Sequence, residues 1–242
     1  MSSRMGTTRR WLCIGALPGL ALLVSPAATS AAISHSTLER LTSSQSLNWS
    51  GYASTSGPFT SVSASWVQPA GTCTSKPTYS SFWVGIDGDG SDSVEQTGSE
   101  VDCAGGKPKY YAWYEMYPAS PVNLSSTVKP GDKFSASVTV HGTKFTLVIK
   151  DTTEHWSHTI NKTSTIAVDA SAEIIAEAPS SDGTVLPLTD FGTARFTSAE
   201  ANGKSIAKQR PDQITMVTDG GTVMAKPSAL SGDDFSVVWH HS

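Results

Sequence analysis

An aromatic segment that surrounds a single carboxylate is the part of this chain best suited to do chemistry. If Tyr110–Tyr117 forms an extended strand, Tyr111, Trp113, Glu115 and Tyr117 share one face, because alternate residues of a strand point the same way. Three rings beside one acid make a poor core, since a buried carboxylate needs polar partners. We therefore expect this face to line a binding cleft; the alternative is an exposed aromatic strand with a peripheral glutamate.

A second acidic position lies near the end of another apolar segment. Glu173 and Glu177 are four residues apart, so they face the same way on a strand, and Pro179 marks the end of that strand. Side chains at strand ends often carry function, and a carboxylate there can take a proton from water and later return it to a leaving group. Position alone does not assign that role, because most glutamates at strand ends are simply solvated.

The sequence lacks the motifs of the common hydrolases. It contains no Gly-x-Ser-x-Gly nucleophile turn, no His-Glu-x-x-His zinc motif and no Asp-Thr-Gly segment. His155 and His158 are three residues apart in a polar stretch, which favours an exposed loop over a metal site. We expect no metal and no cofactor.

Short strands with a period of two are the elements that must position these groups. Val62, Ala64 and Trp66 alternate with serines, and apolar residues alternate again in 134–140 and 145–149, on either side of a His-Gly turn that indicates a β-hairpin. Further strands are expected at 110–117, 172–176 and 235–239. With turn clusters between them and no amphipathic helix, the pattern predicts an all-β fold, an antiparallel sandwich or barrel in one domain.

The first 31 residues have the pattern of a signal peptide. Arg4, Arg9 and Arg10 precede the apolar run Leu12–Val24, and small residues follow it. The run is shorter than the roughly 20 residues that a membrane span needs. We expect residues 1–31 to be the signal peptide of a secreted protein. Residues 32–47 would be a short propeptide or flexible arm, and residues 48–242 the folded domain.

Charge and cysteine content agree with export. Without residues 1–31, 14 Lys and Arg remain against 21 Asp and Glu, a net charge of −7. No basic run remains that could follow a phosphate backbone, so we expect no nucleic acid partner. Cys73 and Cys103 are the two cysteines left. In an oxidising compartment such a pair favours a disulfide over a zinc site, which would need further ligands nearby.

Five short segments occur in an order that resembles a known family. Together they are similar to the glutamic peptidases, or eqolisins, which are known chiefly from fungal acid enzymes. Each segment is weak by itself, but five in order at compatible spacing are specific. The resemblance extends from about Asn48 to the C-terminus and rests on Asn48–Tyr52, Trp83–Gly88, Gln96–Gly98, Ala112–Pro118 and Ala172–Glu177.

The resemblance implies a fold and a set of site residues. The family fold is an antiparallel β-sandwich of the concanavalin A or lectin-like type, with a cleft on its concave sheet. Gln96 and Glu177 match the catalytic pair of the family, and Trp83 matches an active-site tryptophan. The residues expected to bind substrate are Trp49, Trp83, Asp87, Tyr111, Trp113, Glu115 and Tyr117.

Two positions depart from the pattern of the fungal members. Tyr111 stands where those members often carry Asp, and Glu100 stands near a position where some carry Asp. Both changes bear on pH dependence or subsite preference. Neither removes Gln96 or Glu177.

The resemblance implies a secreted, acid-active endopeptidase that needs no metal and forms no covalent intermediate. Glu177 would act as general base and then as general acid, while the Gln96 amide would donate to the developing oxyanion. We expect polypeptide substrates, no membrane partner and a monomer. Two other classes stay open: a carbohydrate-binding or glycoside-hydrolysing lectin-like sandwich that uses Glu115 and Glu177, and a non-catalytic homologue.

Overall fold

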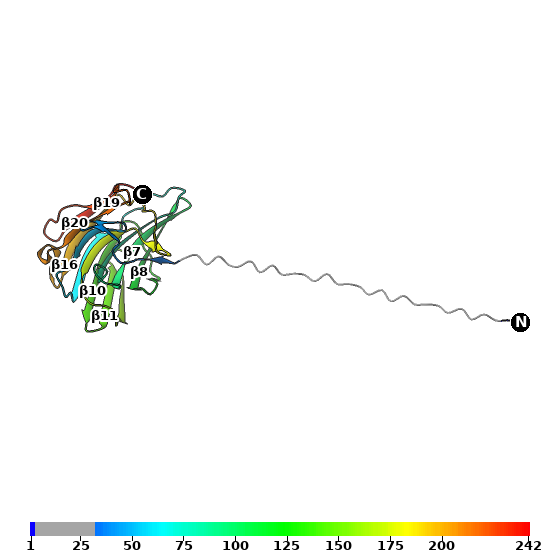
Figure 1. The fold of residues 1–242 in the computed structure, drawn as a ribbon, viewed down its shortest axis with the longest axis horizontal. Coiled ribbons are helices and arrows are strands. Elements are labelled where there is room, and N and C mark those ends of the chain that lie inside the picture. The colour runs from blue at the N-terminus through cyan, green and yellow to red at the C-terminus, as the bar shows by residue number, and fades with distance from the viewer. Residues whose placement is uncertain (3–31) are drawn as a thin grey trace. The chain divides into compact units, whose positions relative to one another are not determined.

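The computed structural model describes residues 1–2 and 32–242. The chain divides into two units, Met1–Ser30 and Ala31–Ser242, and every strand described below belongs to the second unit (Figure 1). Except for its first two residues, the predicted signal peptide, residues 1–31, lies outside the described residues. No helix among the described residues is long and apolar enough to cross a membrane.

Two large sheets, antiparallel along their main strands, form the body of the fold, and this confirms the predicted all-β sandwich; β1 (Ile33–Ser34), β14 (Ser180–Ser181) and β15 (Thr184–Val185) form a small third sheet. The first, which we call the front sheet, has the order β9 (Val122–Asn123), β8 (Lys107–Tyr117), β7 (Val94–Ala104), β6 (Thr78–Ile86), β13 (Ala172–Glu177), β4 (Trp49–Ser54) and β18 (Asp212–Val217). The back sheet has the order β12 (Trp156–Thr163), β11 (Lys144–Asp151), β10 (Lys133–His141), β5 (Ser61–Val67), β16 (Thr193–Ala201), β20 (Phe235–Trp239) and β19 (Val223–Pro227).

Shorter elements complete the described part of the chain. β18 also pairs with β19, so the two sheets are continuous through that strand. The remaining elements are β1 (Ile33–Ser34), β2 (Arg40–Thr42), β3 (Gln45–Ser46), β14 (Ser180–Ser181), β15 (Thr184–Val185), β17 (Lys204–Ser205) and a 3-10 helix at Ile206–Gln209.

The strands predicted from alternation form as expected. In β5 and β10 buried residues alternate with more exposed ones, and the two strands pair so that Val62 lies opposite Val138. The predicted hairpin joins β10 to β11, with His141 opposite Lys144 at its turn. Alternation works here because one face of the back sheet packs on the core while the other faces water.

The front sheet is buried on both faces. Phe82, Val84 and Ile174 point into the main core between the sheets. Trp83, Trp113 and Ile175 point to the other face, where they form a second apolar cluster. Because side chains alternate along a strand, the motif residues of β6, β7, β8 and β13 gather on this second face.

Residues 33–47 pack against the domain. β1 pairs with β14, β3 pairs with β18 in parallel, and Leu38 joins the second apolar cluster. Arg40 forms an ion pair with Asp89. The segment predicted as a propeptide or arm therefore contributes strands and contacts of its own.

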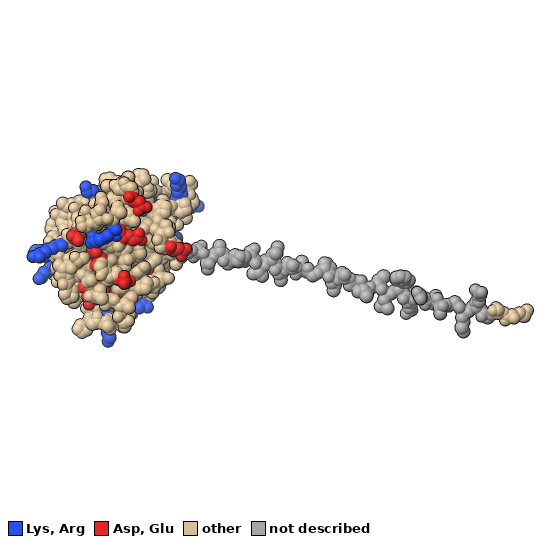
Figure 2. Space-filling model, in the orientation of Figure 1, with Lys and Arg blue, Asp and Glu red and all other residues tan. Residues whose placement is uncertain are grey.

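The surface agrees with the charge balance of the sequence. On the face shown in Figure 2, Lys and Arg side chains lie scattered, and acidic patches lie between them. On that face the described residues form no continuous basic stripe of the kind that follows a phosphate backbone.

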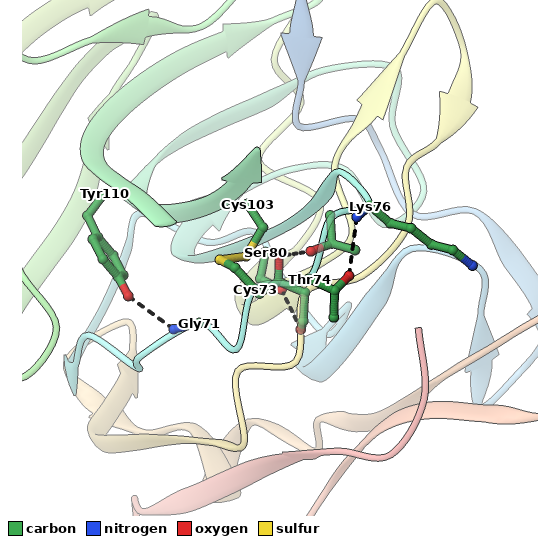
Figure 3. Close-up of a disulfide and its surroundings, with 9 residues drawn as sticks. Gly71, Cys73, Thr74, Lys76, Ser80, Cys103 and Tyr110 are labelled. Carbon is green, nitrogen blue, oxygen red and sulfur yellow. Dashed lines mark hydrogen bonds between the residues drawn. A yellow bond between two sulfur atoms is a disulfide. The ribbon is translucent and has the colours of Figure 1, made fainter. Parts of the chain in front are cut away.

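The predicted disulfide is present. Cys73, in the loop after β5, is bonded to Cys103 in β7 (Figure 3). The loop is also held by a hydrogen bond from the Gly71 N–H to the Tyr110 hydroxyl, at 3.1 Å. Since β7 carries the Gln96 segment, the disulfide ties the loop to a strand of the site.

Removal of this disulfide should lower the free energy of unfolding by about 3–4 kcal/mol, because the two cysteines are 30 residues apart and the bond restricts the unfolded chain. The variant is Cys73→Ala combined with Cys103→Ala, and the measurement is urea denaturation at fixed pH. An unchanged unfolding midpoint would contradict this expectation.

Candidate active site

Two tryptophans on either side of a glycine form the floor of the site. Trp83 of β6 lies opposite Gly98 of β7, which lies opposite Trp113 of β8. A Cβ atom at Gly98 would collide with the Cβ of Trp83 and with the backbone of Phe82. Only glycine therefore fits at this position, which explains the glycine of the Gln-Thr-Gly segment.

Polar side chains flank this floor on two sides. Gln96 lies opposite Glu115 on one side. On the other side, Ser81 of β6 lies opposite both Glu100 and Glu177, which reach it from its two neighbouring strands. All five side chains are completely buried. Gln96 and Glu177 thus approach the same floor from opposite sides.

His35 of the N-terminal segment lies at the centre of this arrangement. Its carbonyl accepts a hydrogen bond from Gln96 Nε2 at 2.6 Å, and its N–H donates to Glu115 Oε2 at 3.0 Å. Its ring stacks on Trp113, with 3.7 Å between the ring centroids and 9° between the planes. Nδ1 lies 3.4 Å from Glu177 Oε2, and Nε2 lies 3.3 Å from Glu100 Oε2.

Donors and acceptors are distributed unequally over the two motif residues. Trp83 Nε1 donates to Glu177 Oε2 at 2.8 Å. Gln96 Nε2 also lies 3.2 Å from Glu115 Oε2, so the amide nitrogen points toward Glu115 and the His35 carbonyl. Among the described residues, Gln96 Oε1 and Glu177 Oε1 have no hydrogen-bond partner. Each motif residue therefore keeps one acceptor oxygen for a further polar group.

Burial dominates the ionisation of the site. It raises the pKa of Glu177 well above its ordinary value, and the Glu115 carboxyl adds to the effect, while the Trp83 N–H acts in the opposite direction. Burial also raises the pKa of Glu115 to about 8, against the N–H of His35 and the hydroxyl of Ser34. It lowers the pKa of His35 to about 3. The neutral forms of all three groups are favoured while His35 occupies the site.

Glu100 shows the same effect. Burial, followed by the nearby Asp102 carboxyl, raises the pKa of Glu100 well above its ordinary value. The Tyr111 hydroxyl donates to Asp102 Oδ2 at 3.0 Å. Tyr111 thus reaches the site indirectly, through the acidic pair formed by Asp102 and Glu100.

The remaining predicted residues lie at varying distances from this centre. Trp49 packs its ring edge-on against Trp83, with centroids 4.9 Å apart, and the partly buried Tyr117 packs on the same cluster. Asp87 accepts hydrogen bonds from three consecutive backbone N–H groups, those of residues 168–170. Those bonds fix a loop, so a contact of Asp87 with substrate stays a prediction.

Sequence reasoning did not single out His35 or Ser34. No local motif marks them, and Glu115, which binds both, lies about 80 residues away in the chain. Glu100 was noted only as a departure from the family pattern, although it forms one side of the site.

Comparison with known proteins places the chain among peptidases. A model of the Peptidase A4 family matches residues 47–239. Aspergillopepsin-2 of Aspergillus niger is 32% identical over 168 residues, which are 66% of this chain and 58% of that protein. The chain therefore spans less than two thirds of this relative's length.

Two solved structures share the fold. Scytalido-glutamic peptidase, in a crystal structure with a transition state analog inhibitor, gives a TM-score of 0.70 at 24% identity and covers 80% of this chain and 98% of that one. Aspergilloglutamic peptidase from Aspergillus niger gives a TM-score of 0.59 at 27% identity and covers 67% and 99%. The match of the family model over most of the sequence, together with this shared fold, shows that the chain belongs to the Peptidase A4 family, the eqolisins.

Proposed function

We propose that this protein is a secreted, acid-active endopeptidase in which Gln96 and Glu177 hydrolyse peptide bonds without a metal or a covalent intermediate. One observation carries the proposal. The main-chain carbonyl of His35 accepts a hydrogen bond from Gln96, while Glu177 lies against the same residue. A peptide in this position has its carbonyl beside the amide donor of Gln96, and the side chain of the same residue lies beside the carboxyl group of Glu177.

The reaction needs only these two side chains and water. Glu177 takes a proton from a water molecule, and the oxygen of that water adds to the carbonyl carbon of the substrate. Negative charge then develops on the carbonyl oxygen, where the Gln96 N–H donates to it. Glu177 returns the proton to the amide nitrogen, the C–N bond breaks, and a carboxylic acid and an amine leave.

Glu177 is a better candidate for the base than Glu173, which shares its strand and face. Trp83 donates to Glu177, which favours the carboxylate that a base requires. Neither oxygen of Glu173 has a hydrogen-bond partner at hydrogen-bond distance among the described residues. Burial raises its pKa well above the ordinary value; the nearby Ser171 hydroxyl acts in the opposite direction, and the carboxyl groups of Asp89 and Asp87 add to the rise. Glu173 is therefore expected to stay protonated.

Glu115 has a supporting role in this proposal. It accepts the N–H of His35 and lies beside Gln96 Nε2. It can thus position the substrate backbone and the Gln96 amide relative to each other. A carbohydrate-active site would use Glu115 as a reacting carboxyl group and would leave Gln96 without a role, so these contacts favour a peptide substrate.

The charge, the disulfide and the acidic residues of the site support export to an acidic medium. A disulfide is typical of proteins in oxidising compartments. A glutamate base with an ordinary pKa near 4.5 works best close to that pH once the site is open to water.

Gln96→Ala is expected to lower kcat/KM for an unfolded protein substrate by about 10²–10³, because one oxyanion donor is lost. Glu177→Gln should lower it by at least about 10²–10⁴, because the base is lost. The matched control is Glu173→Gln, which alters the same face of the same strand and should keep activity within about threefold. Full activity in either of the first two variants, with unchanged circular dichroism, would exclude the mechanism.

Trp83→Phe tests the hydrogen bond to Glu177. The phenylalanine keeps a ring but removes the N–H donor, so the pKa of Glu177 should rise and the acid-side inflection of kcat/KM should move up by about one to two pH units. Trp113→Phe is the control, because the Trp113 N–H donates to Ser81 Oγ at 3.2 Å rather than to Glu177. Equal shifts in the two variants would remove the assigned role of Trp83.

The raised pKa values predict a fold that is more stable in acid. Burial raises the pKa of Glu115 to about 8 and that of Glu95 to about 7, from an ordinary 4.5. Their contribution is complete below pH 4.5 and is lost as the pH rises through those values. The pKa of His35 is lowered to about 3, so this one group makes the fold less stable as the pH falls below 6.5. It opposes the stabilisation by the two carboxyl groups, but it is a single group.

The melting temperature should therefore fall by roughly 5–10 °C between pH 4.5 and pH 8. Glu95→Gln removes one of the titrating groups while keeping its shape, and the difference between the two pH values should shrink. A melting temperature that rises from pH 4.5 to pH 8 would contradict the assignment of these buried carboxyl groups as neutral.

A further inference from the structure

The N-terminal segment enters the site as an extended strand. Ile33 and Ser34 form β1 and pair with Ser181 and Ser180 of β14 in antiparallel register. β14 begins three residues after Glu177, so the strand that receives the segment is part of the same wall of the site. Addition of a strand to an exposed edge is a general way to bind an extended peptide through its backbone.

The next residue is held by the groups that the proposed mechanism uses. The His35 N–H donates to Glu115, and the His35 carbonyl accepts from Gln96 at 2.6 Å. That carbonyl belongs to the peptide bond between His35 and Ser36. Among the peptide bonds of the segment, this is the one whose oxygen lies where the Gln96 amide would stabilise an oxyanion.

The side chain of His35 fills a pocket of its own. It is 1% exposed, lies flat on Trp113 and faces Glu100 and Glu177 through its two ring nitrogens. Neither oxygen of Glu100 has a hydrogen-bond partner among residues 1–2 and 32–242. A fully buried polar group is thus directed at the His35 ring, as expected of a pocket that selects a side chain.

Beyond His35 the chain is tied to the domain by other contacts. The Thr37 carbonyl accepts from Asn48 Nδ2 at 3.0 Å, and the Leu38 N–H donates to the Gly88 carbonyl at 3.1 Å. The segment is therefore held on both sides of the His35–Ser36 bond, upstream by β14 and downstream by the loops around Asn48 and Gly88. Because the chain is fixed on both sides, the His35–Ser36 bond has little freedom to move away from Gln96 and Glu115.

We propose that the His35–Ser36 peptide bond is the site at which this enzyme processes itself. Water adds across the bond, so that His35 gains a carboxyl group and Ser36 becomes a new N-terminal amine. The residues up to His35 then leave, and the site becomes accessible to other polypeptides. Residues from Thr37 onward stay in place through the contacts described above. The proposal rests on the proposed peptidase function.

The test uses the full chain, secreted, purified at neutral pH and then brought to about pH 4, near the ordinary pKa of a glutamate. Intact mass and N-terminal sequencing are followed with time, together with digestion of an added unfolded protein. The wild type should acquire Ser36 as its N-terminus, and digestion should begin after a lag that matches this conversion. Glu177→Gln should keep the residues before Ser36.

Two substitutions at one position isolate the bond from the rest of the site. Ser36→Pro replaces the nitrogen of the bond with a proline nitrogen, so the chain should stay uncut and digest the added protein at least tenfold more slowly. Ser36→Ala is the matched control and should be processed like the wild type. His35→Ala, which empties the Trp113 pocket, should slow formation of the new N-terminus about tenfold or more.

The outcomes separate this proposal from the function on which it rests. If the wild type digests the added protein while keeping residues before Ser36, or is cut at another bond, the processing site is wrong and the peptidase function stands. If it cuts neither itself nor the added protein, both are wrong. Rapid processing of Ser36→Pro at the same bond would also overturn the proposal.

Discussion

The alignment of Trp83, Gly98 and Trp113 across three neighbouring strands is the constraint on which the site depends. The three residues occupy facing positions on β6, β7 and β8, and a Cβ atom at Gly98 would collide with the Cβ of Trp83 and the backbone of Phe82. The rings provide a flat surface on which an imidazole can stack, and they keep the polar groups on two opposite sides. Gln96 and Glu177 lie on opposite sides of this row.

The buried acidic residues of the front sheet differ in their hydrogen-bond partners. Glu95, Glu173 and Glu177 are all nearly or fully buried, and burial raises the pKa of each. Glu177 differs because the Trp83 N–H donates to it and so favours its charged form. A hydrogen-bond donor, rather than exposure, distinguishes Glu177 from Glu95 and Glu173.

Much of the fold could be predicted from sequence, because its back sheet is buried on one face only. The alternation in β5, β10 and β11 follows directly from that geometry. β6 and β7 are buried almost throughout, so they lack a clear alternation, and their site residues were located through the order of the family motifs.

Other features could not be predicted, because they depend on contacts between distant residues. His35 meets Gln96 and Glu115, which lie 61 and 80 residues away in the chain. No local sequence pattern indicates such a contact. Asp87 has a backbone φ of 69°, and its carboxylate accepts hydrogen bonds from the loop at residues 168–170, a partner that no local pattern indicates. Its contact with substrate stays a prediction. A motif identifies a residue, but only the packing shows from which groups its side chain accepts hydrogen bonds.

The pairing of β4 with β18 determines when the site can form as the chain folds. β4 lies near the N-terminal end of the domain and is held between β13 and β18, which are among the later strands. Pairing between such distant segments makes folding slow, because a long loop must close before the contacts form. A chain still being synthesised contains Gln96 long before it contains Glu177 and the strands that enclose it. The complete site therefore arises only when almost the whole chain is available. Under the proposed function, a partly made chain could not cleave the proteins around it.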